Sequence, residues 1–361
     1  MRTFIRVFCA IIVILAGAIS GCGKNQQCPG SPETSREEFE IKRGLDDGLR
    51  VECDLLADSL LKREGPSVDD GLAAAQLASI CERPNRAISI LEGVINRDGD
   101  EKVNVVLGWH IPVKILGHLW IGTIARQAGD VAKAKNAYKT TLKDIEDVEV
   151  IGEESLAAIC HLYLAEIEAE HLKRPDRALR YLRAIGHVES PEGNKVDLYK
   201  DWALYQHARI SKGKDHAAKQ LSYSGETPNP ALFAVIHLYV SGVIPSRLGE
   251  YIRPEKQELF AKAFFDRAMV RTKGSVDTRM LRLVYGKRCE ETESFNEAEK
   301  HYSALFEDES YFSPLAGILL AKCKSQQGKI ADTDEILQKV IDKYPGYESF
   351  VAEFKKIKQE H

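Results

Sequence analysis

One segment of the sequence has a residue spacing that metal sites use. In AEIEAEHLKR, residues 165–174, Glu168 and His171 are three positions apart, and on a helix such a pair lies on one face. Di-iron helical bundles bind their metals with Glu-x-x-His pairs, but they need a second pair on another helix, and this sequence has none. We therefore expect these side chains to lie on a solvated helix face.

Other patterns that carry chemistry are missing from the sequence. It has no G-x-S-x-G, no H-E-x-x-H and no Gly-rich phosphate loop followed by Lys-Ser/Thr. Its eight cysteines are scattered, without a C-x-x-C pair or a Cys/His cluster of zinc spacing. We therefore expect no catalytic residue, no metal and no cofactor.

The cysteines of the chain body divide into two groups. Cys160, Cys289 and Cys323 fall among apolar residues, where we expect them to be small buried side chains. Cys28 and Cys53 are the first candidates for a disulfide, provided that the chain resides in an oxidising compartment.

The N-terminus has the layout of a secretory signal. Residues 1–21 begin with Arg2 and Arg6, continue through an apolar stretch at 7–19 and end in small residues. The apolar stretch is shorter than the roughly 20 residues that a membrane-spanning helix needs. We expect export and removal of this segment.

The end of this segment, Ile19-Ser20-Gly21-Cys22, resembles the lipobox of bacterial lipoproteins. The resemblance implies that Cys22 becomes the lipidated N-terminus, and two or more acyl chains anchor a protein stably to a membrane. In that family an Asp after the Cys favours the inner membrane, so Gly23 implies the outer membrane, facing the periplasm. An ordinary cleavage site with an incidental Cys and a Gram-positive lipoprotein remain alternatives.

The rest of the chain has the pattern of a helical protein. Residues 22–35 are polar and rich in Gly, Pro and Ser, which predicts a flexible tether. From residue 36 to residue 361 apolar residues recur at three- and four-residue spacing, without alternating strand-like runs. We therefore expect an all-α fold. The net charge of −4 argues against nucleic acid as a partner.

Short strings repeat along this helical region. RPNRAISIL at 83–91 and RPDRALRYL at 174–182 share five of nine letters, and each has a Pro where a helix can begin. Further copies include GDVAKAKNAY at 129–138 and FNEAEKHY at 295–302. Aligned in one register, the copies place a small residue at the following positions: Ala87, Ala134, Ala178, Ala218, Ala261, Ala298 and Thr333.

These offsets resemble the tetratricopeptide repeat, over most of residues 67–345. The resemblance implies a right-handed superhelical solenoid of antiparallel helix hairpins, in which each hairpin buries its apolar face against the next. The last segment, 346–361, is then a capping helix. The copies are spaced more widely than the family's period of about 34 residues, which predicts longer helices or loops in the N-terminal copies.

In tetratricopeptide proteins the first helix of each copy lines a partner-binding groove. Transferred by register, the groove positions are Thr123, Arg126, Tyr163, His207, Lys287, Glu290 and Lys322. An equally weighted alternative is that these seven residues are ordinary surface residues without a role in binding. The tryptophans Trp109, Trp120 and Trp202 could line a cleft, but their helical spacing favours the core.

The combined resemblance implies a lipid-anchored periplasmic scaffold that binds protein or peptide partners in envelope assembly, secretion or pilus biogenesis. In this respect the sequence is similar to the helical lipoprotein of the outer-membrane β-barrel assembly machinery and to pilotins. Two alternatives remain: an accessory factor or enzyme of peptidoglycan processing, and a lipoprotein that binds a small apolar ligand.

Overall fold

The structure is a computed structural model of the chain. The structure describes the following residues: 51, 53–105, 110–147, 153–186, 198–221, 230–244 and 265–359. Several predicted features lie outside them: the signal at 1–21, the tether at 22–35, Cys22, Cys28 and Trp109. The division into signal, tether, solenoid (36–361) and capping helix (346–361) stays a prediction.

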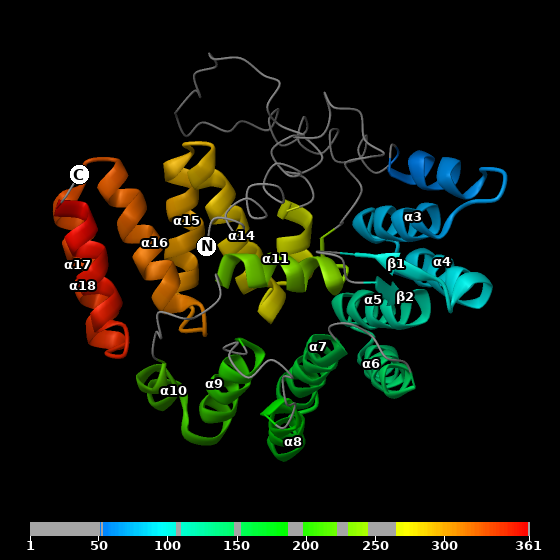
Figure 1. The fold of residues 1–361 in the computed structure, drawn as a ribbon, viewed down its shortest axis with the longest axis horizontal. Helices are drawn as coiled ribbons and strands as arrows, with labels where there is room; N and C mark the ends of the chain where they lie inside the picture. The colour runs from blue at the N-terminus through cyan, green and yellow to red at the C-terminus, as the bar shows by residue number, and fades with distance from the viewer. Residues whose placement is uncertain are drawn as a thin grey trace, which may run out of the picture.

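The described part of the chain is built from helices that pack in neighbouring pairs (Figure 1). The all-α prediction is therefore confirmed. The helices are α3 (Val68–Ile80), α4 (Pro84–Asp98), α5 (Val113–Gln127), α6 (Val131–Glu146), α7 (Glu153–Glu166), η1 (Ile167–His171), α8 (Pro175–Gly186), α9 (Leu198–Lys212), α10 (Lys214–Gln220), α11 (Pro230–Val240), α14 (Val276–Glu291), α15 (Phe295–Glu307), α16 (Ser313–Gln326), α17 (Ile330–Lys343) and α18 (Glu348–Gln359). Residues 53–61 and 265–271 are helical as well.

Local sequence signals explain where helices begin. α3 starts with a capping box, in which the Ser67 side chain accepts a bond from the Asp70 N–H and the Asp70 carboxylate accepts one from the Ser67 N–H. α4 and α8 begin at Pro84 and Pro175, where a missing N–H costs nothing. The prediction that these prolines start helices is confirmed.

The turn inside each hairpin repeats along the chain. Five positions before a register residue the backbone adopts a positive φ, which closes a helix C-terminus. The positive-φ residues are Glu82, Gly129, Lys173, Gly213, Glu293 and Gly328. The register residues that follow them are Ala87, Ala134, Ala178, Ala218, Ala298 and Thr333, and all are buried. The copies that contain these six register residues are therefore structural repeats, whereas Ala261 lies outside the described residues.

Glycines allow two helices of a hairpin to approach closely. A Cβ on Gly122 in α5 would lie 2.5 Å from the ring of Tyr138 in α6, and a Cβ on Gly286 in α14 would lie 2.6 Å from the ring of Tyr302 in α15. The two pairs have the same sequence separation and the same role. Each tyrosine ring occupies the space that a side chain at the glycine would need.

The prediction that the chain has no strands is wrong at one connection. Between α4 and α5, β1 (Lys102–Asn104) pairs antiparallel with β2 (His110–Pro112), with Val103 opposite Ile111. Both of these side chains are buried in the core. The strands are only three residues each, so the helical periodicity around them dominates the sequence pattern.

The stack also folds back on itself. In Figure 1 the helix pairs follow one another along an arc, and α11 lies inside this arc. The Trp120 indole on α5 donates a hydrogen bond to the carbonyl of Val240 at 2.9 Å, and Arg271 donates one to the carbonyl of Ser79 at 2.7 Å. Segments 230–244 and 265–277 therefore cover part of the inner side of the N-terminal helices. No helix in the described residues is long and apolar enough to cross a bilayer.

Candidate binding cleft and the adjoining polar network

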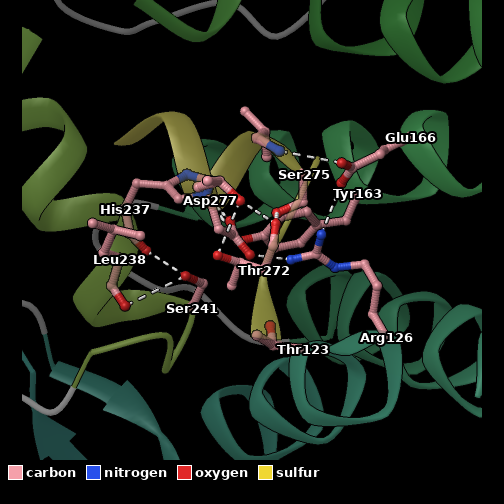
Figure 2. A network of polar contacts seen from close by, with 12 residues as sticks. Thr123, Arg126, Tyr163, Glu166, His237, Leu238, Ser241, Thr272, Ser275 and Asp277 are labelled. Carbon is pink, nitrogen blue, oxygen red and sulfur yellow. Dashed lines mark hydrogen bonds and ion pairs between the residues drawn. The ribbon is translucent and has the colours of Figure 1, made fainter. Parts of the chain in front are cut away.

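A buried cation lies where α5, α7 and α14 meet (Figure 2). The Arg126 guanidinium forms an ion pair with Asp277, donates a bond to Glu166 at 2.8 Å and lies 4.1 Å from the centre of the Tyr163 ring. Its side chain is 4% exposed, and that of Asp277 is fully buried. The planar guanidinium suits this site because it can bond two carboxylates and stack on a ring at once. We call Arg126, Tyr163, Glu166, His237 and Asp277 the Arg126 network.

Asp277 is the charge on which this network depends. Its carboxylate accepts a hydrogen bond from the Tyr163 hydroxyl at 2.8 Å. Burial alone would raise the pKa of Asp277, but the Arg126 cation, with help from His237 and Tyr163, outweighs burial and lowers the pKa to about 2. The carboxylate is therefore ionised at neutral pH, and it balances the charge of Arg126.

His237 on α11 completes the network from the other side. Its Nε2 lies 2.8 Å from the Tyr163 hydroxyl. Because that hydroxyl donates to Asp277, it accepts from Nε2–H. Burial lowers the pKa of His237 despite the nearby Asp277. The imidazole is therefore neutral in the folded protein at neutral pH.

We expect stability to fall as the pH falls from about 7 to about 5. The unfolded state takes up protons on histidine near pH 6.5, whereas burial lowers the pKa of His237, His161 and His301 in the folded state. On these three histidines the unfolded state therefore binds more protons in this window, so their protonation favours unfolding. Urea unfolding across this pH range measures the effect, and a His237→Gln variant should show a smaller pH slope. An unchanged slope in the variant would contradict the assignment of His237.

A cleft of about 200 Å³ opens beside Glu166, between α7, η1, α8, α9 and α14. Its lining is apolar at the base and charged at the rim. The apolar members are Leu162, Ala165, Ala169, Leu182, Trp202, Ile210 and Val276, and the polar members are Glu166, Glu170, Gln206, Arg209 and Arg279. Glu166 belongs to both the cleft and the Arg126 network, and it also accepts a bond from the Val276 N–H at 3.2 Å, at the start of α14.

Contacts with the α15–α16 connection hold the base of the cleft in place. Trp202 is 2% exposed, and its ring lies 5.9 Å from that of Phe312 before α16. Near the same end of α9, the Tyr205 hydroxyl donates to the carbonyl of Glu309. α9 is thus fixed to the α15–α16 connection, so the cleft wall is braced from a distant part of the sequence.

The size and lining of the cleft suit contact with a side chain of a larger partner. Small-molecule sites usually measure about 300–1,000 Å³, so a cleft of about 200 Å³ suits one bulky side chain of a larger partner. The lining residues include no Ser, Thr, Cys, His or Lys, and the carboxylates among them are those of Glu166 and Glu170. The cleft can bury an apolar group and pair charges at its rim.

The structure places the predicted groove residues mainly in two clusters. Thr123, Arg126 and Tyr163 are buried within or beside the Arg126 network. Lys287 and Lys322 both pair with Glu290, which also accepts a bond from the Tyr302 hydroxyl at 3.3 Å. His207 is half-buried on α9, next to Gln206 of the cleft. Partner binding through these residues stays a prediction, and it would require α11 and α14 to leave the first cluster.

The prediction that Glu168 lies on a solvated helix face is wrong. Its side chain is buried and forms an ion pair with Lys135 on α6, whereas His171 is exposed. A one-turn π-helix, η1, carries both residues, so the helical spacing assumed from the sequence does not hold there. Within the described residues no group of three or more His, Cys, Asp or Glu side chains could hold a metal ion.

Several other predicted positions can be placed. Cys160, Cys289 and Cys323 are buried, as predicted. Trp120 lies in the core, while Trp202 is both buried and part of the cleft. Cys53 is buried as well; its predicted pairing with Cys28 stays a prediction because Cys28 lies outside the described residues.

Sequence reasoning missed the charged rim of the cleft and Asp277. Glu166 and Arg279 have no distinguishing spacing in the sequence. Asp277 is the second residue of α14, a position where an acidic residue usually means only a favourable helix start. The burial of Asp277 results from packing against α5 and α7, which no local pattern reveals.

A family model for the tetratricopeptide repeat matches residues 316–347. This region holds most of α16, all of α17 and the turn that leads to α18. No curated protein matches the chain. The chain therefore contains a tetratricopeptide repeat near its C-terminus, and the helix pairs before it share its local construction.

Proposed function

We propose that the protein is a lipid-anchored scaffold of the bacterial cell envelope, which binds a protein partner through the cleft between α7, α9 and α14. Tetratricopeptide repeats generally mediate contacts between proteins. The observation that carries the proposal is the cleft itself, with Trp202 at its base and charges at its rim. Protein interfaces concentrate their binding energy in such anchor pockets.

The lining specifies the chemistry of the partner. A bulky aliphatic or aromatic side chain would fill the apolar base. Among the charged lining residues, Glu170 on η1 is exposed, and Arg209 on α9 is partly exposed. Arg279 already forms an ion pair with Asp308 of the same chain. The partner segment would therefore place a basic group near Glu170 and an acidic group near Arg209, next to its apolar anchor.

The location in the envelope rests on the signal and on the lipobox-like sequence before Cys22. Anchoring near a membrane would raise the effective concentration of the scaffold for partners in the same membrane. The mass of the N-terminal peptide tests this part: we expect a chain that begins at Cys22 and carries acyl groups. An unmodified Cys22, or a chain that keeps residues 1–21, would contradict it.

Filling the cleft should abolish partner capture. Ala169 lines the cleft, and an Ala169→Trp variant would place an indole where the partner's anchor enters. We expect at least a tenfold loss of captured protein from solubilised envelopes, since anchor residues carry about 2 kcal/mol or more.

The matched control is Ala132→Trp, which adds the same side chain at an exposed position of α6. This control should capture the partner as the unmodified protein does, and both variants should unfold at similar urea concentrations. Undiminished capture by a stably folded Ala169→Trp protein would contradict the proposed use of the cleft.

A further inference from the structure

The first described helix, residues 53–61, is fastened to the turn between α3 and α4 by charge pairs. Asp54 accepts a hydrogen bond from Arg83 Nε at 2.8 Å and another from Arg86 Nη1 at 2.9 Å. These contacts lie beside two cysteines, since Cys53 precedes Asp54 and Cys81 follows the last residue of α3.

The two cysteine side chains lie together in a small apolar cluster. Cys53 is 0% exposed and Cys81 is 4% exposed. The cluster around them consists of Ala57, Leu60, Ala73, Ala74, Leu77 and Ile80. The two thiols share a hydrogen bond. A disulfide needs Cβ atoms about 3.5–4.5 Å apart, and the two cysteines are neighbours in one packed cluster.

The pair is chemically unequal. The hydrogen bond that Cys53 donates lowers the pKa of Cys81, and the cations of Arg267 and Arg83 act in the same direction. The same hydrogen bond, together with burial, raises the pKa of Cys53. In the folded chain Cys81 is therefore the more acidic thiol of the two.

We propose that Cys53 and Cys81 form a disulfide in the mature protein, which fastens helix 53–61 to the α3–α4 hairpin. The occurrence of this bond in cells rests on the proposed export to an oxidising compartment. The bond would fix the place where the chain coming from Cys22 joins the described fold. It is an alternative to the pair of Cys28 and Cys53 predicted from the sequence, since Cys28 lies outside the described residues.

The reaction is thiol–disulfide exchange with a disulfide-bearing oxidant, either a small molecule or an oxidoreductase protein. The thiolate of one of the two cysteines attacks one sulfur of the oxidant, forms a mixed disulfide and releases the other sulfur as a thiolate. The second cysteine then loses its proton, attacks the cysteine sulfur of the mixed disulfide and releases the second thiolate. Two cysteine thiols are oxidised, and one oxidant disulfide is reduced to two thiols. Because both cysteines are buried in the folded chain, exchange takes place while helix 53–61 is detached, as in a newly made chain.

Peptide mapping under non-reducing conditions tests the proposal. The full mature chain is unfolded, refolded with oxidised glutathione and alkylated before digestion. We expect a linked peptide that contains Cys53 and Cys81, with Cys160, Cys289 and Cys323 alkylated. Reduction should lower the thermal midpoint by about 5 °C, and a Cys53→Ala/Cys81→Ala variant should show no such shift. A Cys160→Ala control should behave as the unmodified chain does.

The same mapping is applied to protein trapped by alkylation in intact cells. A linked Cys53–Cys81 peptide would support the proposal, whereas alkylation of both cysteines or a Cys28–Cys53 link would overturn it. Acylation of Cys22 is measured in the same samples, so a failure of export is distinguished from a failure of the disulfide in an exported chain.

Discussion

Replacing Asp277 by alanine is expected to lower the free energy of unfolding by about 3 kcal/mol. The variant would leave the Arg126 guanidinium buried without its fully buried counter-ion, and it would remove the acceptor of the Tyr163 hydroxyl. Breaking a buried pair by removing one partner costs about 3–5 kcal/mol. We expect the lower end because Glu166 continues to bond Arg126.

Urea unfolding measures this effect, and two variants make it specific. Arg126→Met/Asp277→Leu should be more stable than Asp277→Ala, because it leaves no unpaired buried charge. Glu335→Ala removes an exposed pair with Lys339 on α17 and should leave stability almost unchanged. If Asp277→Ala unfolded at the same urea concentration as the unmodified chain, α14 would not be held to α5 and α7 in the way described.

Gly122→Ala is expected to lower the free energy of unfolding by about 1–3 kcal/mol, as overpacking does. The added Cβ would lie 2.5 Å from the Tyr138 ring. That ring cannot move aside easily, because it stacks on Tyr163 at 5.2 Å and its hydroxyl accepts a bond from Arg126 at 3.3 Å. Strain at this hairpin would therefore spread to the Arg126 network.

Gly93→Ala is the matched control for this substitution. Gly93 lies within α4, and a Cβ there would have no atom within 4 Å. Alanine should raise stability at this position by about 0.5–1 kcal/mol, because glycine disfavours a helix. A rise in stability in both variants would mean that close helix approach at Gly122 does not limit the packing.

The repeated hairpins could be predicted because their determinants are local. The strings around Ala87, Ala134 and Ala178 carry the small residue, the turn and the helix start within a few positions, and the structure uses each of them in the same way. Such patterns recur in the sequence because each copy must pack its apolar face against the neighbouring copies.

The inner surface could not be predicted by the same reasoning. A groove transferred by register assumes that the arc stays open, but Asp277 and Val240 contact residues of α5 that lie more than a hundred positions earlier. These contacts depend on the curvature accumulated over several hairpins. As a result, Arg126 and Tyr163 are part of a buried network. The accessible cleft lies later in the chain's stack of helices, at Trp202.

Site-specific photo-crosslinking in the native envelope tests the central claim most directly. A photoreactive residue is placed at Gln206, which lines the cleft, and for comparison at Lys139, which is exposed on α6. The account predicts a crosslinked protein from position 206, none from position 139, and loss of the product when Ala169→Trp is added. No product from position 206, or the same product from both positions, would contradict it.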